Sequence, residues 1–162
     1  MLRLSACGAA VLGALWALGP IATQTAAQSA VQAAATPGRL ASVTRLRCTF
    51  RQGAVGGWPK GGAASAAVRP TTLMLRLEGI DIEAGSAVVR TGAMTTEITA
   101  KRTGGYLHFM QTFKGGALYT TTVFDTPSGA FKAVHSRHEY FTVPVPGATS
   151  SPEQYYGECL AE

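Results

Sequence analysis

Leu118-Tyr-Thr-Thr-Thr-Val-Phe124 is followed by Asp125-Thr-Pro-Ser-Gly129 and then by Ala130-Phe-Lys-Ala-Val-His-Ser-Arg-His-Glu-Tyr-Phe141. The two outer segments are rich in Thr, Val, Phe and Tyr, which favour β-strands. Pro127 suits the first central position of a tight turn, and Gly129 tolerates the positive φ that often ends one. Together the three segments predict a β-hairpin, and the rest of the chain is interpreted outward from it.

The register of this hairpin follows from a four-residue turn at 126–129. That turn places Phe124 opposite Phe131 and Thr120 opposite His135. Alternate residues of a strand share a face, so one face of the second arm is expected to carry Phe131, Ala133, His135, Arg137, Glu139 and Phe141. A slip of one residue re-pairs the arms, so this register is a hypothesis.

The face that carries His135, Arg137 and Glu139 holds the densest polar chemistry in the chain. If it points inward, the three side chains line a cavity beside Thr120 and Thr122. Arg137 would then hold an anionic ligand group through two parallel hydrogen bonds, with Glu139 orienting the guanidinium. If the face points outward, the same residues form a solvated ladder, because charged side chains are seldom buried.

The first 27 residues have the features of a secretory signal peptide. Arg3 precedes an apolar segment at 8–18, and small residues at 25–27 favour cleavage after Ala27. The apolar segment is shorter than the roughly 20 residues that span a bilayer. We therefore expect a periplasmic or secreted protein with no stable membrane span after cleavage.

The charge of the chain is mildly basic. It has 14 Lys and Arg against 9 Asp and Glu, so a chain that has lost Arg3 carries about +4. The basic residues form no dense run, and we expect no nucleic-acid partner. Arg45, Arg47 and Arg51 are interpreted as one solvated strand face, with anionic lipid headgroups or cell-wall polymers as the alternative contact.

Cys48 and Cys159 are the two cysteines that remain after the leader. In an exported protein such a pair most often forms a disulfide, and two free buried thiols are the alternative. A bridge would close nearly the whole domain, which the chain-entropy model values at about 4 kcal/mol.

The remaining chain is expected to form one domain at 41–162, entered through a flexible Ala-rich linker at 28–40. Eight segments have strand character, mostly joined by short turns, at 44–51, 71–78, 86–91, 95–102, 106–113, 118–124, 130–141 and 154–160. This pattern predicts an all-β fold, a single antiparallel meander closed into a small barrel, with a β-sandwich as the alternative. The stretch at 53–70 is expected to be a Gly/Ala loop containing Trp58, which would form the mouth of the barrel.

The pattern over 44–160 resembles the lipocalin-type calycin barrels. Gly56-Gly-Trp58 has the Gly-x-Trp spacing that those barrels place on their first strand. In this chain the triplet falls after the first expected strand. The resemblance implies a closed barrel and does not name a family.

No motif in the sequence predicts catalysis, a metal site or a cofactor. Cys48 and Cys159 have no further Cys or His at ligand spacing, and His135 and His138 lie on opposite faces of one strand. No nucleophile elbow is present. We therefore expect a binding module rather than an enzyme, with a small enzyme that uses His135 and Glu139 as a lesser alternative.

Each of the three candidate functions predicts a different geometry. A small-molecule binder, with Trp58, Thr120, Thr122, His135, Arg137 and Glu139 at its site, should have a ligand-sized internal cavity. A module that binds an extracytoplasmic protein, similar to the exported, disulfide-bearing lysozyme inhibitors, should have a filled barrel and an exposed apolar patch. The basic net charge disfavours a basic lysozyme as the target. An enzyme should bring His135 and Glu139 together on a cleft.

Overall fold

The structure is a computed structural model and describes residues 38–58, 62–140 and 151–162. The expected signal peptide at 1–27, most of the expected linker at 28–40 and the expected inward Phe141 lie outside these residues. In the described part of the chain, no helix is long and apolar enough to span a bilayer.

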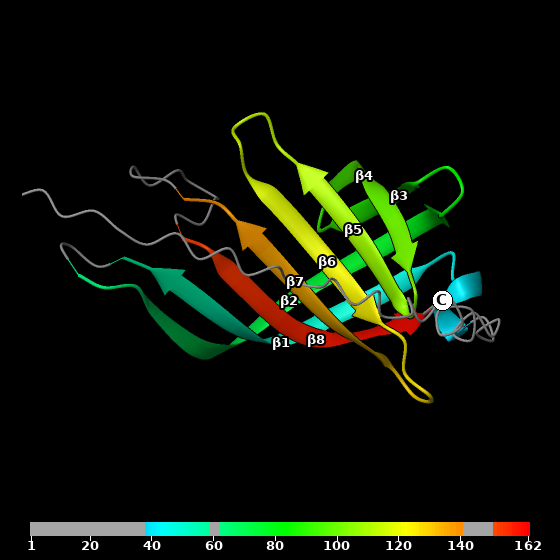
Figure 1. Ribbon diagram of the computed structural model, residues 1–162, viewed down its shortest axis with the longest axis horizontal. Helices are drawn as coiled ribbons and strands as arrows, with labels where there is room; N and C mark the ends of the chain where they lie inside the picture. Colours follow the sequence, from blue (N-terminus) through cyan, green and yellow to red (C-terminus); the bar gives the residue numbers. More distant parts are fainter. Residues whose placement is uncertain (1–37, 59–61, 141–150) are drawn as a thin grey trace, which may run out of the picture. The chain divides into compact units, whose positions relative to one another are not determined.

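Eight antiparallel strands form a closed barrel in which each strand pairs with the next and the last pairs with the first (Figure 1). The elements are η1 (Arg39–Ser42), β1 (Leu46–Gly57), β2 (Ser65–Asp81), β3 (Ser86–Thr91), β4 (Met94–Thr103), β5 (Tyr106–Thr112), β6 (Leu118–Phe124), β7 (Phe131–His138) and β8 (Glu153–Ala161). The predicted all-β meander barrel is confirmed. Closure leaves most strands with two neighbours, which removes exposed sheet edges.

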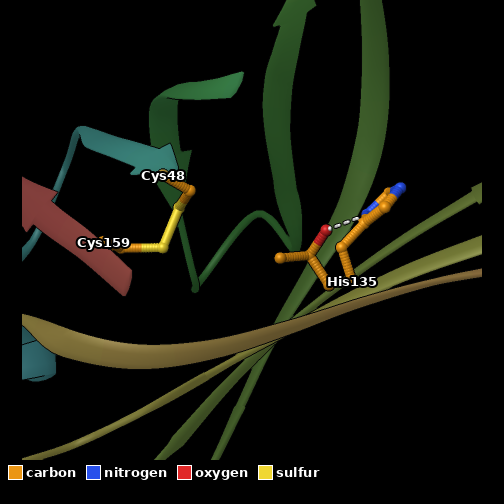
Figure 2. The surroundings of a disulfide bond; sticks show 4 residues. Cys48, His135 and Cys159 are labelled. Atoms are coloured by element: carbon orange, nitrogen blue, oxygen red, sulfur yellow. Dashed lines mark hydrogen bonds between the residues drawn. A yellow bond between two sulfur atoms is a disulfide. The ribbon is translucent and has the colours of Figure 1, made fainter. Parts of the chain in front are cut away.

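The disulfide lies in the ladder that closes the barrel. Cys48 of β1 is the register partner of Cys159 of β8, their Cα atoms are 4.0 Å apart, and the two sulfurs are bonded. Both residues are fully buried, and Figure 2 shows the bond between the two strands. The predicted pairing of the first strand with the last is confirmed, and a disulfide is compatible with an extracytoplasmic protein.

The core is formed by alternate residues of each strand, because successive side chains of a strand point to opposite faces. All eight strands contribute buried residues to it. Alternate apolar residues are buried along these strands, among them Leu46, Phe50, Leu75, Leu77, Ile98, Ala100, Leu107 and Phe109.

One end of the barrel is closed by η1. Leu40, the last residue of the expected linker, is only 2% exposed and belongs to the core. The Arg39 guanidinium lies 4.5 Å from the centroid of the Phe131 ring. It donates hydrogen bonds to the carbonyl oxygens of Thr126 (3.0 Å) and Gly129 (2.9 Å). This segment therefore covers the core and holds the β6–β7 connection.

The predicted register of the β6–β7 hairpin was wrong by one residue. Phe124 pairs with Lys132 rather than Phe131, and Thr121 rather than Thr120 pairs with His135. The connection is longer than a four-residue turn: the Thr126 hydroxyl donates to the Ala130 carbonyl, and Arg39 binds the loop from outside. Gly129 has a φ of 70°, the positive value expected of it.

The predicted loop at 53–70 was also wrong. Residues Gly53 to Gly57 of β1 pair with Arg69 to Ser65 of β2, so the two strands continue as a long ribbon (Figure 1). β2 pairs with β3 only from Arg76 onward, so its first half has β1 as its single neighbour among the described strands. Pro70 fits there, because an edge strand tolerates a missing backbone donor.

Between Phe50 and Gln52, β1 shifts register against both neighbouring strands, which marks a β-bulge. Gly157 of β8 lies against the bulge. A Cβ atom at this glycine would lie 2.1 Å from the Thr49 carbonyl oxygen and 2.6 Å from Phe50 Cα. The close approach of β8 to the bulge therefore requires glycine at this position.

Candidate functional site

The polar face of β7 points into the barrel. His135 and Glu139 are buried, and the Arg137 side chain is 20% exposed. Of the two orientations considered for this face, the structure has the inward one. The face does not form a solvated ladder. These residues occupy the half of the barrel opposite η1, which we call the open end.

Thr121, rather than Thr120 or Thr122, is the threonine beside this face. The one-residue change of register turns Thr121 inward, and it is buried. Thr122 instead contacts His108, with 3.1 Å between Oγ1 and Nδ1, and Thr120 pairs with Ser136. The expected lining role of Thr120 and Thr122 is thus corrected to Thr121.

His135 lies at the base of the open end. Its Nδ1 shares a 2.9 Å hydrogen bond with the Thr121 hydroxyl, dashed in Figure 2. Phe50, Tyr119 and Tyr155 surround the ring at centroid distances of 5.8–5.9 Å. Burial, and secondarily the Arg137 charge, lower the pKa of His135 to about 4, so the ring is neutral at pH 7.

His135 also lines a small cavity of about 20 Å³, shared with Val89, Phe109 and Tyr119. In the described part of the chain, His135 Nε2 and Arg137 Nε are the buried side-chain atoms without a hydrogen-bond partner. A cavity of this size has room for one water molecule. It is far smaller than the several hundred Å³ of a typical ligand pocket.

Arg137 lies one row above His135, held between two aromatic rings. Its guanidinium carbon is 5.3 Å from the Tyr119 ring centroid and 5.2 Å from the Tyr155 ring centroid. Its Nη1 is 3.6 Å from a Glu153 carboxylate oxygen. Tyr119 and Glu153 are its register partners on β6 and β8, so the sandwich and the ion pair follow directly from strand pairing.

Two buried carboxylates complete this group. The Tyr119 hydroxyl donates to Glu139 (2.8 Å), and the Tyr155 hydroxyl donates to Glu153. Burial is the main cause that raises the pKa of each tyrosine to about 12, and the carboxylate that accepts its hydrogen bond adds to it. The Arg137 guanidinium therefore lies between two tyrosine rings, each of which donates its hydroxyl to a buried carboxylate. We call Arg137, the two tyrosines and the two glutamates the arginine clamp.

Above the clamp, the open end carries an exposed aromatic pair. Trp58 and Tyr140 are each 57% exposed and pack edge to face with ring centroids 5.6 Å apart. They line a hollow of about 500 Å³ together with His138, Glu139 and Pro152. We call this hollow the mouth; Trp58 lies there as expected, although at the end of a strand ribbon rather than in a long loop.

Four clamp and lining residues were missed by sequence reasoning: Thr121, Tyr119, Glu153 and Tyr155. Tyr119, Thr121 and Val123 alternate along β6, but the run of three threonines gives no periodic contrast that could fix which face is inward. Tyr155 shares one strand face with Gly157 and Cys159, and extending that alternation by two residues would have found Glu153.

Tyr119 contacts both groups of the expected enzyme: its ring packs on His135, and its hydroxyl donates to Glu139. His135 lines the 20 Å³ cavity, and Glu139 lines the mouth, so the two groups line different hollows. Within 38–58, 62–140 and 151–162, no three His, Cys, Asp or Glu side chains are grouped to hold a metal ion.

Comparison of the chain with protein-family models, with curated proteins and with solved structures finds no match. The geometry of the open end is therefore the basis for the function proposed below.

Proposed function

We propose that this chain is an exported binding module that docks a partner protein against the open end of its barrel. The observation that carries the proposal is an exposed aromatic pair, Trp58 and Tyr140, at one end of a barrel whose inward positions hold buried side chains. Exposed aromatic residues above a rigid base are typical anchors of protein interfaces.

The small size of the cavity beside His135 favours a protein partner over an enclosed small molecule. Its volume is about 20 Å³, whereas a lipocalin-like container would need a volume more than ten times larger. Several large apolar side chains are exposed on the described surface instead, and Trp58 and Tyr140 are the two of them that line the mouth.

The state of Arg137 also disfavours an anionic ligand deep in the barrel. Its guanidinium is already paired with Glu153 and enclosed by the Tyr119 and Tyr155 rings. An incoming anion would have to displace a buried carboxylate, which would then lack a partner. Arg137 therefore supports the walls of the mouth better than it serves as a binding group.

Export to the periplasm or the exterior is part of the proposal. It is supported by the features of a signal peptide at 1–27 and by the disulfide between Cys48 and Cys159, since such bonds persist in oxidising compartments. Secretion of the full chain, followed by mass measurement of the mature protein, tests this part; a mature mass that includes residues 1–27 would contradict it.

A second candidate function is the binding of a small molecule in the mouth itself. The hollow of about 500 Å³ lies within the size range of ligand pockets. Its aromatic pair and the nearby Glu139 would orient a ligand. This candidate predicts that a small molecule saturates the mouth and competes with any protein partner.

Capture from the extracytoplasmic fraction with immobilised full-length protein tests the main proposal. Trp58→Ala with Tyr140→Ala should abolish capture of the partner, and the purified partner should bind this variant at least about tenfold more weakly. Tyr106→Ala is the matched control, because Tyr106 is also exposed and packs edge to face, at 5.5 Å from Phe124. Equal binding by the mouth variant and the wild type would refute the proposal.

A further inference from the structure

We infer that the barrel binds the surface of an anionic lipid membrane through the outer face of β1, β2 and β3. None of the residues that carry this inference lines the mouth, so it goes beyond the proposed function and does not depend on it. We call this surface the basic face. Its exposed arginines are Arg47 and Arg51 of β1, Arg76 of β2 and Arg90 of β3.

Three of these arginines form one row across three neighbouring strands. Arg76 is the register partner of Arg47 on one side and of Arg90 on the other. Directly opposite residues have Cβ atoms about 5 Å apart, so like charges in these positions repel each other and destabilise the sheet. An anionic surface that covers the row would relieve this repulsion.

The acids of the chain neutralise the basic face only in part. Arg47 pairs with Glu162 at 2.7 Å and Arg90 pairs with Glu78 at 3.3 Å, yet these two arginine side chains remain 45% and 54% exposed. The other two arginines form no ion pair with a described residue. All 9 Asp and Glu of the sequence lie among the described residues, so the face keeps a net positive charge.

A hollow beside the row brings several phosphate-binding groups together. It measures about 510 Å³, which is within the size range of ligand-binding hollows, and its lining includes Arg47, Thr49, Arg51, Glu158 and Leu160. Glu158, the acid in this group, is paired with Lys132. Two guanidinium groups and one hydroxyl therefore line one space, and arginine binds phosphate oxygens through two parallel hydrogen bonds.

Exposed apolar side chains beside the arginines favour a lipid surface over a soluble anionic polymer. Met74 is 61% exposed and lies two residues before Arg76, on the same face of β2. Leu160 is 47% exposed and is the register partner of Arg47 on β8. At a membrane, basic side chains bind the headgroups while neighbouring apolar side chains enter the boundary with the acyl chains. A soluble polyanion would offer Met74 and Leu160 no apolar contact.

Co-sedimentation with lipid vesicles tests the inference, using protein recovered from the extracytoplasmic fraction after expression of the full chain. The vesicles contain phosphatidylcholine alone or with about one third phosphatidylglycerol. Each arginine near an anionic surface should strengthen binding about fivefold. Arg47→Gln with Arg51→Gln and Arg76→Gln should therefore weaken binding to the anionic vesicles about a hundredfold. Arg76→Gln alone, which breaks no ion pair, should weaken it about fivefold.

The control of equal charge change is Lys101→Gln with Arg102→Gln and Lys114→Gln, on exposed residues outside the basic face. It should weaken vesicle binding less than about fivefold, and circular dichroism checks that the barrel of each variant is intact. Equal losses in the two triple variants would show that net charge alone matters and would overturn the inference. Equal binding of the wild type to neutral and anionic vesicles would also overturn it.

Met74→Ser separates a lipid surface from a soluble polyanion. It should weaken binding to the anionic vesicles about fivefold and leave binding to inorganic polyphosphate unchanged, because only the vesicle has an apolar interior. Met94→Ser, on a residue that is 71% exposed at the start of β4, is the matched control. Vesicle binding that does not respond to Met74→Ser would assign the face to a soluble polyanion and overturn the lipid partner. Failure of partner capture through the mouth would refute the proposed function and leave this inference standing.

Discussion

The two ends of the barrel are formed by the same strands and filled in opposite ways. The closed end contains Leu46, Cys48 and Cys159, all fully buried, beneath the Arg39–Ser42 segment. The open end contains His135 and the arginine clamp. Burial of apolar surface stabilises a fold, whereas buried charges cost solvation that their partners only partly offset.

This difference indicates a division of roles along the barrel axis. Apolar packing and the disulfide stabilise the closed end, while the open end gives up stability to hold a defined set of polar groups below the mouth. The division makes quantitative predictions, because changes at the closed end should affect folding, and changes at the mouth should affect binding alone.

The largest effect is expected at the disulfide. Cys48→Ala with Cys159→Ala should lower the free energy of unfolding by about 5 kcal/mol, since the bond spans 111 residues of sequence. Urea unfolding under oxidising conditions measures the change. In reducing agent, the wild type should have the same free energy of unfolding as the variant. The free energy of unfolding of the variant should not change when reducing agent is added. A loss below about 1 kcal/mol would show that apolar packing alone holds the closed end.

Arg137→Ala should lower the free energy of unfolding by about 4 kcal/mol, because it leaves the buried Glu153 without its cation and removes both tyrosine contacts. Arg90→Ala is the matched control. Arg90 pairs with Glu78 at 3.3 Å, but its side chain is 54% exposed, so its loss should cost less than about 1 kcal/mol. Equal losses would mean that the clamp behaves like an ordinary surface pair.

Acid should weaken the open end through His135. Its pKa is lowered to about 4 in the folded chain from 6.5, so the unfolded chain binds more protons between these values. Stability is therefore complete above pH 6.5 and falls by about 3 kcal/mol as the pH decreases to 4. Unfolding of wild type and His135→Gln across this range measures the difference, with His108→Gln as the outer-face control. Parallel profiles of wild type and His135→Gln would contradict the assignment.

The closed end could be predicted from sequence far better than the open end. Alternation of large apolar residues, as at Leu46, Cys48 and Phe50, gives a strong contrast between the two faces of a strand. The disulfide was predicted from the two cysteines that remain after the expected signal peptide. These features are local or compositional, so they required no knowledge of how distant strands pair.

The open end depended on interactions that the local sequence does not contain. The register of the β6–β7 hairpin is set partly by Arg39, more than 80 residues away from the turn that it binds. The β1–β2 ribbon is composed largely of Gly and Ala, which have low β propensity, and only its cross-strand pairing makes it a strand. Because the predicted register was wrong by one residue, Thr120 and Thr122 were expected at the site in place of Thr121. Tyr119 was not expected there for the same reason.

The smallest effect on stability, and the sharpest test of the division, is expected at Trp58. Because its side chain is mostly exposed, Trp58→Ala should change the free energy of unfolding by no more than about 0.5 kcal/mol. Urea unfolding of this variant, followed by circular dichroism, measures that change. If the ends have separate roles, the same variant should still lose its partner, since an exposed ring held on a rigid base is free to bind without contributing to the core. A loss of 2 kcal/mol or more would place Trp58 within the folding core, and the mouth would then be part of the fold rather than a surface built for a partner.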